Sequence, residues 1–125
     1  MRNRINSFMY ALRGIKRATQ SEVNIKIHLT IAILVIICGF LFQISTTEWL
    51  VVLLCFGLVL SMEVMNTAIE TVVDLVSPNQ HKLAGRAKDL AAGAVLIAAI
   101  FAAISGLIIF IPKGWLLLTD ALNCL

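Results

Sequence analysis

The pattern of hydrophobic and polar positions divides the chain into three long apolar stretches separated by short polar segments. The stretches are residues 27–44, 49–76 and 90–111. A helix needs about 20 mostly apolar residues to cross the core of a bilayer, and each stretch approaches or exceeds that length. The second stretch has no charge through Met62 and then continues with charges along one helical face. The pattern therefore predicts three transmembrane helices.

Residues 3–20 lack the apolar length to span a membrane. Phe8 and Leu12 recur at helical spacing, while Arg13 falls on the opposite side. This spacing predicts an amphipathic helix that lies in the membrane interface. Because 125 residues make one domain by length, we expect residues 1–125 to form a single all-α membrane domain.

Composition and charge fit the same interpretation, since 60% of the residues are hydrophobic and 14% are charged, against about 25% charged in soluble domains. Of the 10 Lys and Arg residues, only Lys113 follows the third stretch, and none lies in segment 43–48. The positive-inside rule then places the N-terminus and segment 77–89 on the cytoplasmic side. Segment 43–48 and the C-terminus face outward. The net charge of +3 fits this topology and anionic lipid, and gives no reason to expect nucleic acid as a partner.

The second stretch carries an acidic face. Glu63, Glu70 and Asp74 fall within roughly 40° of one another on a helix, and Asn66 lies about 60° to one side. Charged residues inside a membrane span are costly and usually functional. Glu63 lies inside the apolar layer, where we expect no counter-charge beside it, and it suits a general base acting on a membrane-dissolved hydroxyl. The carboxylates nearer the boundary suit Mg²⁺, which prefers oxygen ligands.

Two further polar clusters are expected at the same depth as the acidic face. They are Glu22, Asn24 and His28, just before or at the start of the first stretch, and Arg86, Lys88 and Asp89, just before the third. Acidic groups for a metal, basic groups for a phosphate and a buried carboxylate form a set suited to phosphoryl transfer. The chain has no P-loop, protein-kinase signature or Gly-rich phosphate motif, which excludes kinases of those types.

Other interpretations stay open from these residues alone. The acidic face is compatible with a structural polar network in an accessory packing subunit that has no chemistry. An intramembrane Glu at an oligomer seam also fits a small ion-coupled transporter, although a transport path should carry polar groups through to the outer side. The spacing of Ala94, Ala98, Ala102 and Gly106 forms a small-residue seam that permits close packing, within the chain or between copies.

Two motifs carry a resemblance to a known family. They are Glu63-x-x-Asn66-Thr67-Ala68-Ile69-Glu70-x-x-x-Asp74 and Gly85-Arg86-Ala87-Lys88-Asp89. From about Phe8 to Lys113, the chain resembles the bacterial diacylglycerol kinase family of integral membrane lipid kinases. The resemblance implies a multi-pass protein of the bacterial cytoplasmic (inner) membrane and a homotrimer with a composite site between protomers. It also implies ATP as co-substrate and Mg²⁺ as cofactor.

The resemblance assigns roles by position to the acidic residues. Glu63 would be the catalytic base toward the lipid hydroxyl. Glu22 and Glu70 would hold the metal together with the ATP phosphates, and Asn66 would support the site.

The same resemblance implies a set of nucleotide-binding residues. Lys88 would contact the terminal phosphates, with Asp89 beside it. Tyr10, Asp74 and His81 fall where the family contacts or borders the nucleotide.

The identity of the lipid depends on finer features. Asn24 and His28, in the motif Glu22-x-Asn24-x-x-x-His28, resemble the branch that prefers undecaprenol, although that branch can also use diacylglycerol. The diacylglycerol-preferring branch has a carboxylate where this chain has His28. With Arg86, these residues are expected to support the site or contact the substrate. The expected product is undecaprenyl phosphate, or phosphatidic acid if the substrate is diacylglycerol.

Overall fold

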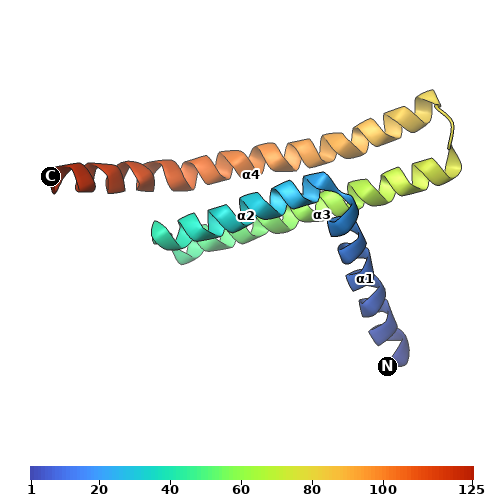
Figure 1. The fold of residues 1–125 in the computed structure, drawn as a ribbon, viewed down its shortest axis with the longest axis horizontal. Helices are drawn as coiled ribbons and strands as arrows, with labels where there is room; N and C mark the ends of the chain where they lie inside the picture. Colours follow the sequence, from blue (N-terminus) through green and yellow to red (C-terminus); the bar gives the residue numbers. More distant parts are fainter.

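The chain forms four helices and no strands. A computed structural model describes all residues 1–125. The helices are α1 (Arg2–Ser21), α2 (Val23–Leu41), α3 (Thr46–Val76) and α4 (Lys82–Asn123). In Figure 1, α3 and α4 form a long antiparallel pair, α2 lies along α3, and α1 projects away from the bundle. Helices α2, α3 and α4 are each long and apolar enough to cross a membrane, so the all-α prediction with three apolar spans is confirmed.

The helices begin and end at different residues from the apolar stretches, and local contacts explain the differences. Helix α2 starts before residue 27, at Val23, directly after the chain turns at Glu22. Segment 77–89 is only partly a loop, because α4 already begins at Lys82 and not at residue 90. The reason is a cap: His81 Nδ1 accepts a hydrogen bond from the Leu83 N–H at 3.1 Å. Helix α4 also continues through Pro112, which removes one backbone donor without ending the helix.

The α2–α3 turn, called the turn end of the bundle, is fixed by backbone and side-chain hydrogen bonds. Gln43 closes α2 with a left-handed φ of 51°. Its neighbour Ile44 donates its N–H back to the Gly39 carbonyl at 3.2 Å, which satisfies a carbonyl at the helix end. Ser45 and Glu48 then form a capping box, with bonds of 3.2 and 2.8 Å between each side chain and the other's N–H. The two spans are therefore joined by a short, well-defined connection.

The best-packed apolar cluster lies at the turn end. Ile44, Val52 and Ile109 are buried there, and large aromatic side chains surround them. Phe42 and Phe110 meet edge to face with ring centroids 5.7 Å apart. At the same end, Lys113 Nζ lies 3.3 Å from Glu48 Oε2 and links α4 to the start of α3.

Most apolar side chains have no partner within the chain. Only 11 of the 125 residues are buried, so the three spans need lipid or other protein surfaces to cover them. Helix α4 packs closely along α3, whereas α2 contacts α3 and does not closely approach α4. A space therefore remains between the three spans. Its polar border and the opposite end of the bundle, called the loop end (residues 77–81), hold the candidate site.

Candidate functional site

The acidic face of α3 changes from buried to exposed as it approaches the loop end. Glu63 is 2% exposed and is the only charged side chain that is buried. Glu70 is half-buried and Asp74 is exposed. At about 1.5 Å per residue, the face extends roughly 16 Å along the helix. The face therefore connects the apolar interior of the bundle with its polar end.

Glu63 is not isolated, because a histidine of the neighbouring span contacts its carboxylate. His28 Nε2 of α2 lies 3.0 Å from Glu63 Oε1. The two side chains are 24% and 3% exposed, respectively. Sequence reasoning placed His28 in a separate cluster because the two residues are far apart in the chain. The antiparallel packing of α2 on α3 brings them together.

Asn66 and Glu70 form the next layer toward the loop end. Asn66 Nδ2 donates to Glu70 Oε1 at 3.4 Å. Asn66 Oδ1 is buried and has no hydrogen-bond partner. Thr67 Oγ1 donates to the Glu63 carbonyl at 3.0 Å, so that hydroxyl is engaged with the backbone. The layer therefore offers a carboxylate and an amide oxygen that is free to accept or to ligate.

Glu22 lies at the junction of α1 and α2, where the backbone is extended (φ −103°, ψ 120°). Ala18 and Ile25, on either side of the junction, are buried and anchor it to the bundle. Counted from the contact between His28 and Glu63, Glu22 is about 9 Å along α2 and Glu70 about 10 Å along α3. The two carboxylates expected to bind metal thus lie at the same level. The chain by itself forms no group of three or more His, Cys, Asp or Glu side chains that could hold a metal ion.

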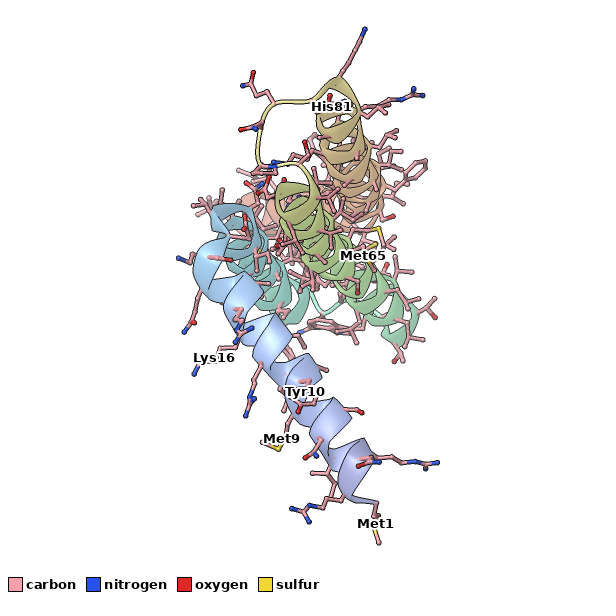
Figure 2. The ribbon with its side chains drawn as sticks, turned by 90° about the vertical axis from the view of Figure 1, so that its right-hand side faces the viewer. Met1, Met9, Tyr10, Lys16, Met65 and His81 are labelled. Carbon is pink, nitrogen blue, oxygen red and sulfur yellow. The ribbon has the colours of Figure 1, made fainter.

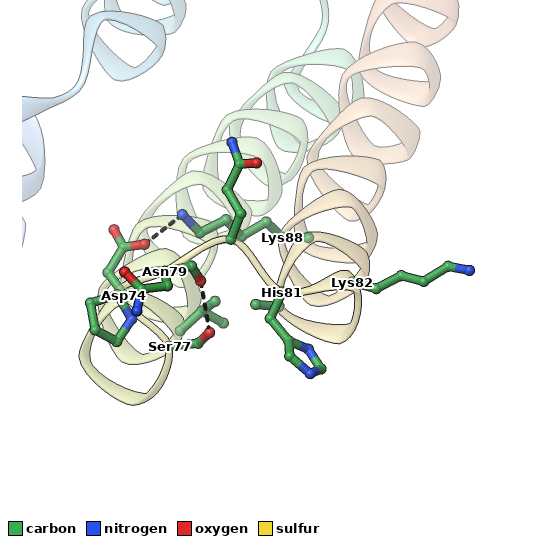
Figure 3. A pocket seen from close by; sticks show the side chains of 11 residues that line it. Asp74, Ser77, Asn79, His81, Lys82 and Lys88 are labelled. Carbon is green, nitrogen blue, oxygen red and sulfur yellow. Dashed lines mark hydrogen bonds and ion pairs between the residues drawn. The ribbon is translucent and has the colours of Figure 1, made fainter.

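A polar pocket of about 510 Å³ opens at the loop end. Its walls come from the end of α3, the loop and the first turns of α4, and include three of the expected nucleotide-binding residues: Asp74, His81 and Lys88. Lys88 Nζ donates to Asp74 Oδ1 at 2.5 Å across the pocket, and Ser77 Oγ bonds the Asn79 carbonyl in its floor (Figure 3). Lys82 also lines this pocket, and sequence reasoning missed it. Lys82 lies beside the pocket because α4 begins at this residue.

Not every expected residue joins this pocket within one chain. Tyr10 lies on the part of α1 that projects from the bundle, well away from His81 (Figure 2), and its ring packs 5.8 Å from the Arg13 guanidinium carbon. Asn24, Arg86 and Asp89 are exposed near the same end. The roles expected for these residues stay predictions from the sequence.

An apolar cavity of about 500 Å³ lies between the three spans, and the sequence pattern gave no sign of it. Val35 of α2, Phe56 and Val59 of α3, and Gly106 of α4 are among its lining residues, nearly all of which are hydrophobic. His28 also lines the cavity. Because His28 contacts Glu63, the buried carboxylate lies at the polar border of an apolar space. Such an arrangement can bring a hydroxyl on an apolar molecule to a base.

Comparison with known proteins supports a common family. Residues 9–110 match the family model described as prokaryotic diacylglycerol kinase. The chain is 46% identical over 116 residues to the undecaprenol kinase of Bacillus subtilis (strain 168), covering 90% of this chain and 94% of the relative. It is 41% identical over 111 residues to a diacylglycerol kinase of Synechocystis sp., covering 88% of this chain and 63% of the relative.

A third relative extends the similarity. The chain is 35% identical over 94 residues to a diacylglycerol kinase of Haemophilus influenzae, covering 75% of this chain and 80% of the relative. The matched residues include α2, α3 and most of α4. With its three apolar helices, the chain is a multi-pass membrane protein. It belongs to the prokaryotic diacylglycerol kinase family, a family of lipid kinases.

Proposed function

We propose that this protein transfers the γ-phosphate of ATP to the hydroxyl of a membrane lipid at the cytoplasmic face, with Mg²⁺ as cofactor. The observation that carries the proposal is the buried Glu63 carboxylate, held at 3.0 Å by His28 between an apolar cavity and a polar end. A charged group is rarely kept inside a membrane span without a function. Family membership supports the reaction class.

Glu63 acts as the general base in this reaction. The proton of the lipid hydroxyl moves to a carboxylate oxygen of Glu63 while the hydroxyl oxygen forms a bond to the γ-phosphorus. The bond from that phosphorus to the bridging oxygen breaks, and ADP leaves with the electron pair. General bases typically contribute a factor of about 10²–10⁴ to the rate.

Glu22 and Glu70 are the carboxylates that would hold Mg²⁺. The donor set fits this ion, which binds through one or two carboxylates and completes its shell with water and substrate phosphates. The unpartnered Oδ1 of Asn66, beside Glu70, adds an oxygen acceptor to this layer. When bound there, the ion would supply charge neutralisation for the transferred phosphoryl group.

The polar pocket is the proposed place of the ATP phosphates. Lys88 is the basic residue that reaches across it, where it pairs with Asp74. We place His81 and Asp89 beside the nucleotide. Tyr10 joins them if α1 of a neighbouring protomer covers the pocket, as expected for a composite site in a homotrimer. The many uncovered apolar side chains of the spans are available to contact lipid or further copies.

The proposed topology follows from the basic residues. The N-terminus and the loop end face the cytoplasm, where ATP is available, and the turn end faces outward. Helix α1 then lies in the inner interface with exposed Phe8 and Leu12 turned toward lipid. We propose the cytoplasmic membrane as the location.

Undecaprenol is the proposed preferred acceptor, with diacylglycerol as the alternative. The extensive match to an undecaprenol kinase supports this order. The products would be undecaprenyl phosphate or phosphatidic acid. Kinetics on both lipids, measured side by side in mixed micelles with ATP and Mg²⁺, decide between them.

The test of the function uses the purified protein and its Glu63→Gln variant. We expect ATP-dependent phosphorylation of lipid by the wild type, its loss on removal of Mg²⁺ with EDTA, and at least a hundredfold lower kcat for the variant. The variant should keep its oligomeric size and ATP affinity. Normal turnover by Glu63→Gln contradicts the role as base. Ion flux into proteoliposomes without ATP, in a protein that phosphorylates no lipid, favours a transporter instead.

A further inference from the structure

His28 occupies an unusual position between two environments. It is on α2, it lines the apolar cavity, and its Nε2 lies 3.0 Å from Oε1 of the buried Glu63. Its side chain is 24% exposed, whereas that of Glu63 is 3% exposed. The imidazole therefore stands between the cavity and one face of the carboxylate.

A carboxylate in an apolar layer needs a polar partner to hold its charge and orientation. Burial of an unpaired charge is strongly unfavourable, and an ionised carboxylate accepts hydrogen bonds at both of its oxygens. The contact of 3.0 Å between Nε2 and Oε1 engages one oxygen and leaves Oε2 without a partner from His28. The free oxygen is then the one available to a hydroxyl.

We propose that His28 is a positioning residue for the phosphoryl transfer, fixing the Glu63 carboxylate so that its second oxygen faces the lipid hydroxyl. The proposal rests on the proposed function and adds a residue that acts through the base and does not itself touch the transferred group. Because a shift of about 1 Å at a reacting group can lower a rate by about a hundredfold, the contact acts mainly on kcat. Affinity for ATP, which binds nearer the loop end, should not depend on it.

Two matched substitutions test whether the contact with Glu63 matters, or only the presence of a polar side chain at position 28. In His28→Gln, the side-chain amide nitrogen reaches approximately the place of Nε2 and can still donate to Glu63. In His28→Asn, the amide nitrogen stays near the place of Nδ1 and falls short of the carboxylate. Both variants are polar and uncharged, so they differ mainly in reach. Thr30→Val on the same helix is the control, since the Thr30 hydroxyl is exposed and bonds only the Lys26 carbonyl.

The experiment measures kcat, lipid KM, ATP affinity and thermal stability for wild type and all three variants in the same micelles. We expect His28→Asn to lower kcat roughly ten- to a hundredfold with lipid KM and ATP affinity within about threefold. His28→Gln should retain kcat within about threefold, and Thr30→Val should match the wild type.

The outcomes distinguish a failure of the positioning role from a failure of the proposed function. An active wild type with equal kcat for the Gln and Asn variants overturns the positioning role alone. So does a loss that appears in lipid KM, or one that follows a loss of folded protein. A wild type that phosphorylates no lipid overturns the proposed function, and the positioning role with it.

Discussion

Gly39 of α2 packs directly against the indole ring of Trp49 at the turn end. A Cβ added at Gly39 would lie 2.6 and 2.8 Å from two atoms of that ring, and 3.2 Å from Ile44 Cδ1. Contacts below 3.0 Å force a shift, and the ring cannot move freely because it also packs on Phe40, with centroids 4.9 Å apart. The close approach of the two spans therefore requires glycine at this position.

The substitution Gly39→Ala places two effects in opposition. Ala in a helix interior is favoured over Gly by about 1 kcal/mol. Overpacking a tight contact costs about 1–3 kcal/mol. The expected net effect is a destabilisation of about 1 kcal/mol. In a Trp49→Phe background, the two clashing ring atoms are absent, so the same change should stabilise the protein by up to about 1 kcal/mol.

The assay is a double-mutant cycle, in which the free energy of unfolding of each variant is measured in detergent by circular dichroism. Gly14→Ala on α1 is the control, because a Cβ there would meet nothing within 4 Å; it should stabilise the helix with either residue at position 49. A Gly39→Ala protein that is more stable than the wild type with Trp49 in place refutes the packing argument. So does a cycle with no coupling between the two positions.

Two further predictions concern the loop end and the turn end. Lys88→Met should raise the KM for ATP roughly ten- to a hundredfold, because a charged hydrogen bond to phosphate is lost, while the melting temperature stays nearly unchanged because the pair with Asp74 is largely exposed. Steady-state kinetics check this, with Lys26→Met as the control, and an unchanged KM contradicts the placement of ATP. Gln43→Gly should raise the melting temperature, because glycine adopts a φ of 51° without strain; Gln43→Val should lower it, and the reverse order in thermal unfolding would exclude strain at this turn.

Much of the architecture follows from local patterns in the sequence. The apolar stretches predict three helices because the backbone of a membrane span must satisfy its own hydrogen bonds. The helical spacing of Glu63, Glu70 and Asp74 places them on one face, and their exposure increases along α3 as the spacing predicts. Helix α3 ends at Val76, two residues before Pro78, which cannot continue a helix. Each of these features depends on residues close together in the chain.

Tertiary structure decided the features that depend on two helices at once. The contact between His28 and Glu63, the cavity that His28 lines and the pairing of Asp74 with Lys88 across the polar pocket each join distant segments. The start of α4 at Lys82, by contrast, depends on a local cap from His81 that the hydrophobic pattern does not reveal. Periodicity gives the direction of a side chain around its own helix. The depth and rotation at which antiparallel helices pack determine which side chains meet, and that information arises only when the helices associate.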